Sequence, residues 1–238
     1  MPPCRSWSRA WRRSGGCAWG SPPFVVSSSG WGYPGKKSLR AAEQAAPRVQ
    51  EARADYRKFV EDIPPERLIF VDEAGVNRAL TRRFARAAKG VRAVGRVPQN
   101  DGPNLTVVGA LGWNGVRAAM SLEGAMDGAA FRVFVEQVLA PTLSPGDVVV
   151  LDNLKPHYVR GVREAIEQRQ ARLVYLPPYS PDFSPIEQCW SKVKAFLRAV
   201  GARTREGLEQ ALDVAFDRVT RTDARGWFRA SGYPVQAS

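Results

Sequence analysis

Short apolar runs recur between residues 68 and 176, and five of them have the length and composition of β-strands. They lie at 68–72, 105–113, 116–122, 147–151 and 172–176. Asn114 and Gly115 form a turn dipeptide between the second and third runs, which predicts that these two strands pair as a hairpin. The run at 147–151 is apolar almost throughout, as is typical of a strand covered on both faces of a sheet.

Between and after these runs, apolar residues recur at helical spacing. Asp127 is positioned to cap the first of four predicted helices. The apolar positions of these helices are Phe131, Phe134, Val135, Val138 and Leu139; Val159, Val162 and Ile166; Ile186, Trp190, Val193 and Leu197; and Leu208, Leu212, Ala215 and Val219. An antiparallel group of strands followed by alternating helices and strands predicts an α/β fold, with helices flanking a mixed five-stranded sheet.

The first 38 residues differ from the rest of the chain. They contain Trp7, Trp11, Trp19 and Trp31 among Arg, Ser, Gly and Pro, with neither helical nor strand periodicity. Such a composition offers little from which to build a core, so we predict that residues 1–38 are disordered or translated out of frame. Residues 39–66 are predicted as a linker and a helix that Pro47 interrupts. Residues 67–233 then form the main domain and residues 234–238 a tail.

The chain has a formal net charge of +12 and a pI of about 10.2. A balance this basic favours an anionic partner, most often nucleic acid, although a generally basic surface would give the same count. No run approaches the roughly 20 apolar residues that span a membrane, and no apolar signal segment follows the basic N-terminus. Three cysteines without metal-ligand spacing and a single histidine argue against a structural zinc site.

Two aspartates directly follow buried strands. Asp72 closes the run Leu-Ile-Phe-Val, and Asp152 closes the run Val-Val-Val-Leu. Ligand sites in open α/β sheets form at the carboxyl ends of strands, so two such strands side by side would bring both carboxylates within metal-bridging distance. Glu187 is the third candidate, 35 positions after Asp152 (187 − 152), at the start of the helix that follows a proline-rich loop.

Clustered carboxylates repel one another unless a cation neutralises them. Magnesium prefers hard oxygen ligands, of which a protein site often supplies only a few. Two such ions roughly 4 Å apart activate a water or a 3′-hydroxyl and stabilise the leaving oxygen of a phosphodiester. The three acids are therefore candidates for a metal site that acts on phosphodiesters.

Each acid also has a purely structural interpretation. Asp72 and Asp152 belong to a residue type that often begins a turn after a strand. The run from Ser184 to Glu187 has the pattern of a capping box with proline at the first helical position. Capping would not exclude metal ligation, and the order of the three acids on these elements favours the catalytic interpretation.

Basic residues follow two of the acids. Those after Asp72 are Arg78, Arg82, Arg83, Arg86, Lys89, Arg92 and Arg96. We interpret this stretch as a phosphate-contacting arm or hairpin, whose binding would depend on salt; the alternative is a solvated surface loop. Lys194 and Arg198 follow Glu187 along one edge of its helix, which suits a metal beside a phosphate backbone.

His157 follows Asp152 at a distance of five residues (157 − 152). One interpretation places it behind the acids or against a phosphate. The other makes it a water-exposed residue at a helix N-terminus.

Three segments together resemble one family. They are Val71-Asp72-Glu73-Ala74-Gly75, Leu151-Asp152-Asn153-Leu154 followed by His157, and Leu-Pro-Pro-Tyr-Ser-Pro-Asp-Phe-Ser-Pro-Ile-Glu from Leu176 to Glu187, continued by Trp190, Lys192 and Lys194. They resemble the DDE endonuclease domain of bacterial insertion-sequence transposases in the mariner superfamily, over roughly residues 36–233. Ser184 stands where the family usually has Asn, and both residues cap helices well.

The resemblance implies an RNase H-like fold, with residues 67–233 as the DDE catalytic domain. It implies two divalent ions, Mg²⁺ or Mn²⁺, held by the catalytic triad Asp72, Asp152 and Glu187. The implied reaction is nicking at transposon ends and then strand transfer to target DNA. The DNA-contacting candidates are Arg78, Arg82, Arg83, Lys89, His157 and Lys194. A homodimer and a cytoplasmic, nucleoid-associated location in a bacterium are implied by the resemblance alone.

Members of this family carry paired helix-turn-helix modules ahead of the catalytic domain, and residues 1–35 do not resemble them. We therefore expect a truncated or frame-shifted chain that lacks its DNA-recognition domain. Two alternatives stay open. One is another RNase H-like nuclease that acts on RNA–DNA hybrids or junctions, and the other is an inactive remnant that binds DNA by charge alone.

Overall fold

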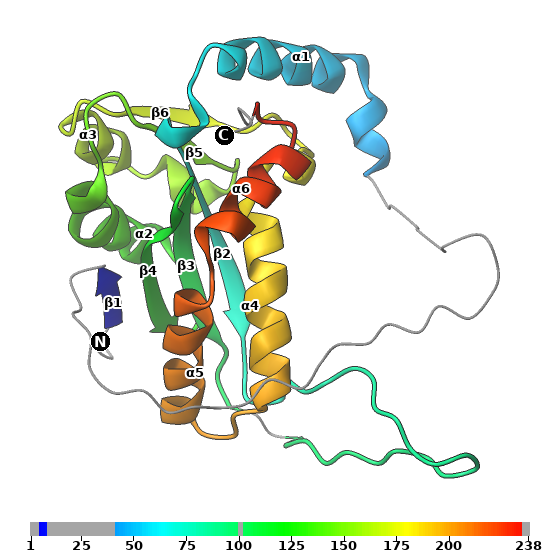
Figure 1. Ribbon diagram of the computed structural model, residues 1–238. Coiled ribbons are helices and arrows are strands. Elements are labelled where there is room, and N and C mark those ends of the chain that lie inside the picture. The colour runs from blue at the N-terminus through cyan, green and yellow to red at the C-terminus, as the bar shows by residue number, and fades with distance from the viewer. Residues whose placement is uncertain (1–4, 9–40, 100–101, 235–238) are drawn as a thin grey trace.

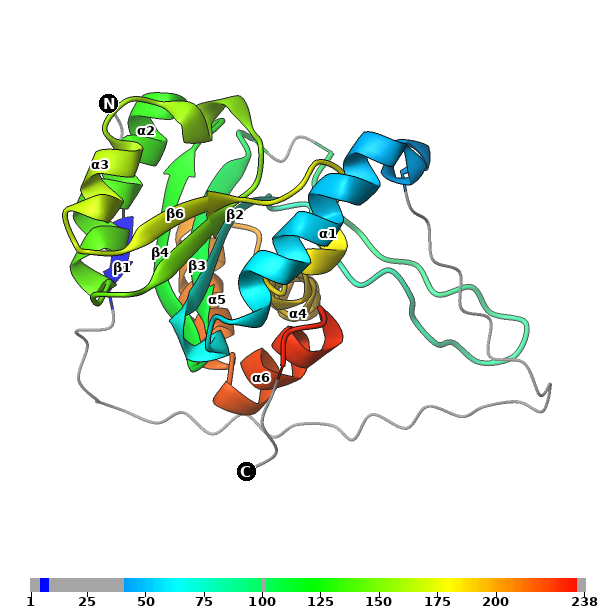
Figure 2. The same cartoon turned by 90° about the horizontal axis from the view of Figure 1, so that it is seen from above.

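The computed structural model describes the backbone of residues 5–8, and residues 41–99 and 102–234 with their side chains. One sheet lies between two layers of helices (Figures 1 and 2). Its strands are β1 (Arg5–Ser8), β2 (Leu68–Val76), β3 (Leu105–Gly112), β4 (Gly115–Glu123), β5 (Val148–Leu151) and β6 (Arg172–Tyr175). Across the sheet, the strand order is β1-β4-β3-β2-β5-β6.

Strands β2 to β6 form the mixed five-stranded sheet that the sequence predicts. β2, β3 and β4 are antiparallel neighbours, whereas β5 and β6 run parallel to β2. β1 adds a short sixth strand, antiparallel to β4, in a segment for which the sequence predicts no regular element. The rest of the predicted disordered segment, residues 1–4 and 9–38, lies outside the described residues.

The strand that carries Asp72 is longer than predicted. It continues to Val76, because β3 pairs with it along its whole length, from Ile69 opposite Gly112 to Val76 opposite Leu105. The predicted hairpin of β3 and β4 is confirmed. Its turn lies one residue earlier than expected, at Trp113–Asn114, because Gly115 already pairs with Gly112.

Three helices cover one face of the sheet: α4 (Ile186–Val200), α5 (Arg205–Asp217) and α6 (Arg221–Ala230). Phe70, Trp190, Leu212 and Phe228 are among the residues buried beneath them. The sequence predicts a single helix after α4, and this prediction is wrong. Thr220 and Asp223 form a capping box that starts a new helix, so Val219 is buried between two helices and is not part of one.

The opposite face is covered by α2 (Gly128–Val133), a π-helical segment (Phe134–Leu139) and α3 (Val162–Glu167). Asp127 caps α2 as predicted, since its side chain accepts a hydrogen bond from the Ala130 amide at 2.7 Å. Phe131, Phe134 and Ile166 are fully buried in this second core. Val159, which the sequence assigns to the next helix, precedes α3.

Helix α1 (Pro47–Glu61) lies over the N-terminal end of α4 in both views (Figures 1 and 2). Pro47 is its first residue, a position that proline favours, so the predicted interruption is the start of the helix. Its buried residues are Val49, Arg53, Tyr56 and Val60. In the described part of the chain, no helix combines the length and the apolar character needed to cross a membrane.

Candidate active site

The two aspartates lie on neighbouring strands. In the parallel pair of β2 and β5, Phe70 is level with Val150, so Asp72 and Asp152 each lie two residues beyond this pair, and Asp152 is close enough to act on Asp72 electrostatically. β5 ends at Leu151, so Asp152 is the first residue beyond it, whereas Asp72 lies inside β2 and pairs with Gly109 of β3. The closeness that the sequence predicts therefore follows from the sheet register.

Glu187 lies in the first turn of α4, close enough to act on Asp72 electrostatically. Burial raises the pKa of Asp72 to about 7, and repulsion by Glu187, Asp152 and Glu73 adds to the shift. Negative charge on Asp72 is thus disfavoured, and a cation beside it would relieve the repulsion.

The capping box predicted at Glu187 is absent. Among the described residues, no side chain caps the N-terminus of α4, and Glu187 is exposed. Its carboxylate is therefore available for another role.

The donor set suits a hard divalent cation, since all three groups are carboxylates. Within residues 41–99 and 102–234, however, no three acidic, histidine or cysteine side chains gather tightly enough to enclose a metal ion. Asp72 and Asp152 are instead each engaged by a neighbouring side chain. The acids thus fit the ion chemically, although they are not gathered around one point.

Trp190 of α4 holds Asp72. Its indole Nε1 donates a hydrogen bond to Asp72 Oδ2 at 3.0 Å. The ring passes over Gly109, where a Cβ atom would lie only 2.9 Å from the indole. Glycine opposite Asp72 therefore makes the approach of Trp190 possible. The sequence identifies Trp190 only as a core residue, because a helical period does not reveal a hydrogen bond.

His157 holds Asp152 and is fully buried. Its Nδ1 lies 2.7 Å from Asp152 Oδ1, its Nε2 lies 2.8 Å from Glu73 Oε1, and its ring packs on Phe131. Burial disfavours the charged ring, but the hydrogen bonds and charges of Asp152 and Glu73 outweigh it and raise the pKa of His157 to about 10. The imidazolium thus links the two carboxylates.

This burial corrects two interpretations of His157. A ring without exposed surface cannot contact a DNA phosphate, and it is not the water-exposed helix residue of the alternative. The remaining interpretation made from the sequence, that His157 supports the acids without facing the substrate, agrees with these contacts. Glu73 is the partner that sequence reasoning missed. One feature of the sequence could have pointed to Glu73. Side chains alternate along a strand, so the residue after Asp72 faces the opposite side of the sheet from Asp72.

The basic stretch after Asp72 lies in residues 77–99, a segment after β2 that projects from the sheet (Figures 1 and 2). Arg82, Arg83 and Lys89 are exposed on it. Arg78 is half-buried at its base, where Arg203 Nη1 donates to the carbonyl oxygens of Arg78 at 2.6 Å and of Leu80 at 2.9 Å. The described part of the loop contains no strand, so it is not a β-hairpin; an arm and a solvated surface loop both fit this observation. Lys194 is half-buried on α4.

One protein-family profile matches the chain. The profile of the family described as DDE superfamily endonuclease matches residues 67–209, more than half of the chain. No curated protein matches the sequence significantly.

Solved structures of similar fold include three of Mos1 transposase. The paired-end complex with the left transposon end has a TM-score of 0.66 at 18% identity, over 84% of this chain and 62% of that one. The strand transfer complex has a TM-score of 0.61 at 17% identity, over 84% and 62%. The catalytic domain with Raltegravir and Mn has a TM-score of 0.58 at 14% identity, over 82% and 90%.

The present chain thus spans less than two thirds of the longer Mos1 chains and most of the isolated catalytic domain. The mixed sheet flanked by helices is the RNase H-like fold of that domain. With the family profile extending from β2 into α5, the chain belongs to the DDE superfamily of endonucleases.

Proposed function

We propose that this chain is the catalytic domain of a DNA transposase, which nicks transposon ends and joins them to target DNA with the help of divalent metal ions. The observation that carries the proposal is the electrostatic coupling of Asp72 to Asp152 and Glu187 within a DDE endonuclease domain. Two ions, Mg²⁺ or Mn²⁺, are the proposed cofactors. Mos1 paired-end complexes have been solved with each of these metals.

Asp72, Asp152 and Glu187 are the proposed metal ligands. When bound, divalent cations activate the attacking oxygen and stabilise the leaving oxygen of a phosphodiester. The Trp190 N–H donates to Oδ2 of Asp72 and so orients that carboxylate. His157 orients Asp152 and balances part of the negative charge near it.

DNA is the proposed substrate and partner. Arg82, Arg83 and Lys89 are exposed on the projecting loop, and Lys194 follows Glu187 along α4. Cations in these places would contact the phosphate backbone, and a net charge of +12 supports such binding. Action as a homodimer, a bacterial origin and association with the nucleoid belong to the same proposal.

Nicking of supercoiled plasmid tests this function. The wild-type chain should convert supercoiled to open-circular DNA in Mg²⁺ or Mn²⁺ and not in EDTA. Asp152→Asn should lose this activity, whereas Asp62→Asn, which changes an exposed aspartate at the end of α1, should retain it. Circular dichroism of each variant establishes that it is folded.

Three results would contradict the proposal. Nicking by Asp152→Asn at the wild-type rate would remove the acids from the mechanism. A folded wild-type chain that binds DNA without nicking it would favour an inactive, DNA-binding remnant. Cleavage of RNA–DNA hybrids in preference to duplex DNA would point to a different RNase H-like nuclease.

A further inference from the structure

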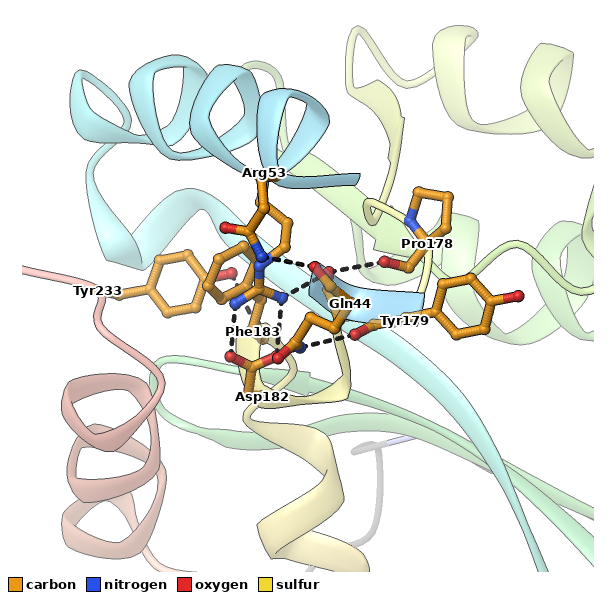
Figure 3. Close-up of polar contacts among 9 residues, drawn as sticks. Gln44, Arg53, Pro178, Tyr179, Asp182, Phe183 and Tyr233 are labelled. Carbon is orange, nitrogen blue, oxygen red and sulfur yellow. Dashed lines mark hydrogen bonds and ion pairs between the residues drawn. The ribbon is translucent and has the colours of Figure 1, made fainter. Parts of the chain in front are cut away.

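A buried polar network joins α1 to the loop that leads into α4 (Figure 3). Arg53, in the middle of α1, has only 6% of its surface exposed. Its guanidinium donates two hydrogen bonds to the Asp182 carboxylate, from Nη1 at 2.9 Å and from Nη2 at 2.7 Å, and a third from Nη1 to Ser180 Oγ at 2.7 Å. A bidentate pair of this kind is both strong and directional.

Gln44, in the 3-10 helix Ala42–Ala45 just before α1, binds the same loop. Its Nε2 donates to the carbonyl oxygen of Tyr179 at 2.8 Å and to Asp182 Oδ1 at 3.2 Å (Figure 3). Tyr179 has a φ of 55°, in the left-handed region that costs a non-glycine residue about 1–2 kcal/mol. Such a conformation persists only where the surroundings hold it, and Gln44 contributes to that hold.

The end of the loop is fixed by aromatic side chains. The Phe183 ring packs against the Arg53 guanidinium, which lies 4.0 Å from its centroid, and stacks with the Tyr56 ring at a centroid distance of 5.6 Å. Its carbonyl oxygen accepts a hydrogen bond from Tyr233 Oη at 2.7 Å, and Tyr233 Oη lies 2.9 Å from Tyr56 Oη. Residues 179–183 are thus held from α1 and from the C-terminal segment together.

We infer that Arg53 is a positioning residue for Glu187. Glu187 follows Phe183 by four residues (187 − 183), and α4 has no side-chain cap of its own in the described structure. The loop therefore determines where α4 begins and where the Glu187 carboxylate lies. The inference rests on the proposed function, because it concerns the place of a proposed metal ligand.

A role in packing alone explains Arg53 less well. A buried ion pair contributes little net stability compared with apolar residues of the same size, and Val49, Tyr56 and Val60 already pack α1 onto the domain. The guanidinium also orients the loop, because it binds both carboxylate oxygens of Asp182 and the Ser180 hydroxyl. α1 also lies outside residues 67–209, so a segment outside the matched domain would set the geometry of its third acid.

Calorimetric titration of the full chain with Mn²⁺ tests this inference. Arg53→Ala and Asp182→Asn should each weaken Mn²⁺ binding by about 10- to 100-fold, as the loss of a group that orients a metal ligand does. The double variant should bind about as weakly as either single variant, because both remove one interaction. Asp182 is 38% exposed in its side chain and asparagine preserves its shape, so this variant decides the matter if Arg53→Ala does not fold.

Two controls separate positioning from stability. Arg48→Ala removes an exposed arginine from the same helix, and Ile166→Ala destabilises the core on the opposite face of the sheet. Both should bind Mn²⁺ as the wild type does. Wild-type affinity in Asp182→Asn, or an equal loss in Ile166→Ala, would overturn the inference.

Hydrogen exchange keeps this test distinct from that of the proposed function. A wild-type chain that binds no Mn²⁺ contradicts the proposed metal site and not the network. Exchange at the amides of residues 183–189 should then be faster in Asp182→Asn than in Ile166→Ala. Equal exchange in these two variants would overturn the positioning role.

Discussion

The strand-borne acids Asp72 and Asp152 differ from the helix-borne Glu187 in how the fold places them. The register of β2 and β5 sets the two aspartates side by side, and Trp190 and His157 each hold one carboxylate. Glu187 is exposed, and its backbone follows a loop held by Arg53 of α1 and by Gln44 of the preceding 3-10 helix. The sheet thus supplies one half of the proposed site, whereas the other half depends on contacts between segments far apart in the sequence.

The largest expected effect is on nicking, when the acids are neutralised one at a time. Asp72→Asn and Glu187→Gln should each lower the rate of metal-dependent nicking by about 100- to 1000-fold, because each removes a proposed ligand of the ions that would stabilise the transition state. Plasmid conversion at saturating Mn²⁺ measures this loss. A Glu187→Gln chain as active as the wild type would leave only the two strand-borne acids in the site.

The same two variants should differ in stability without metal. The pKa of Asp72 lies near 7 in the fold and at 3.8 ordinarily, so its ionised form disfavours folding. This destabilisation is absent below the ordinary pKa, grows as the pH rises from about 4 to about 7, and is complete above that range. Asp72→Asn should raise Tm near pH 8, by about 2–4 °C for each kcal/mol relieved, and not near pH 4.

Exposed Glu187 gives the contrast. Glu187→Gln should change Tm by less than about 2 °C at either pH, as surface substitutions usually do. A loss of Tm in Asp72→Asn at high pH would show that its charge is stabilised by the fold and would contradict the repulsion among the acids.

The next effect concerns the histidine behind Asp152. His157→Gln should reduce the free energy of unfolding by roughly 3 kcal/mol, because it removes the buried cation between two carboxylates. The double variant Glu73→Gln with His157→Gln should recover part of this loss. Without the imidazolium, the carboxylates of Glu73 and Asp152 both lack a compensating cation, and the double variant neutralises one of them. Urea denaturation measures both variants. A loss below about 1 kcal/mol in the single variant would contradict the bridging role.

Gly109→Ala sharpens the account of Asp72. The added Cβ would meet the Trp190 ring at 2.9 Å, which should cost about 1–3 kcal/mol of stability and draw the indole away from Asp72. Gly75→Ala is the matched control in the neighbouring strand, where an added Cβ meets no atom within 4 Å. Equal stability of the two variants in urea would mean that Trp190 does not need the space over Gly109.

The smallest effect is expected from the projecting loop. Replacing Arg82 and Arg83 together by alanine should weaken DNA binding and reduce the salt dependence by about one unit of slope for each phosphate that is no longer neutralised. Replacing exposed Arg163 and Arg169, beside α3, is the charge-matched control. Fluorescence anisotropy at several salt concentrations compares the pairs. Equal slopes would assign the loop no special role in DNA binding.

Much of the fold follows from local patterns in the sequence. The apolar run 147–151 predicts a buried strand. Asp127 predicts the start of a helix, and residues 105–122 predict a hairpin. The structure contains all three. The closeness of Asp72 to Asp152 was predicted only on the condition that their strands are neighbours, and the structure meets this condition because β2 pairs with β5. The second C-terminal helix was missed although Thr220 and Asp223 carry a recognisable capping pattern.

The contacts that orient the acids are harder to predict, because they join distant residues. His157 meets Glu73 across 84 positions, and Arg53 meets Asp182 across 129. One local signal for Arg53 was present: Val49, Arg53, Tyr56 and Val60 recur at helical spacing, so an arginine occupies a buried stripe. A buried arginine in such a stripe indicates a partner, but the sequence does not identify it.

Whether Asp72, Asp152 and Glu187 bind the same metal ions is tested most directly by a crystal structure of the chain grown with Mn²⁺. Anomalous scattering from manganese should appear between Asp72 and Asp152 and within ligand distance of Glu187, with the Glu187 carboxylate turned toward the aspartates. Manganese bound elsewhere in the chain, with no anomalous signal at these three residues, would contradict the proposed site.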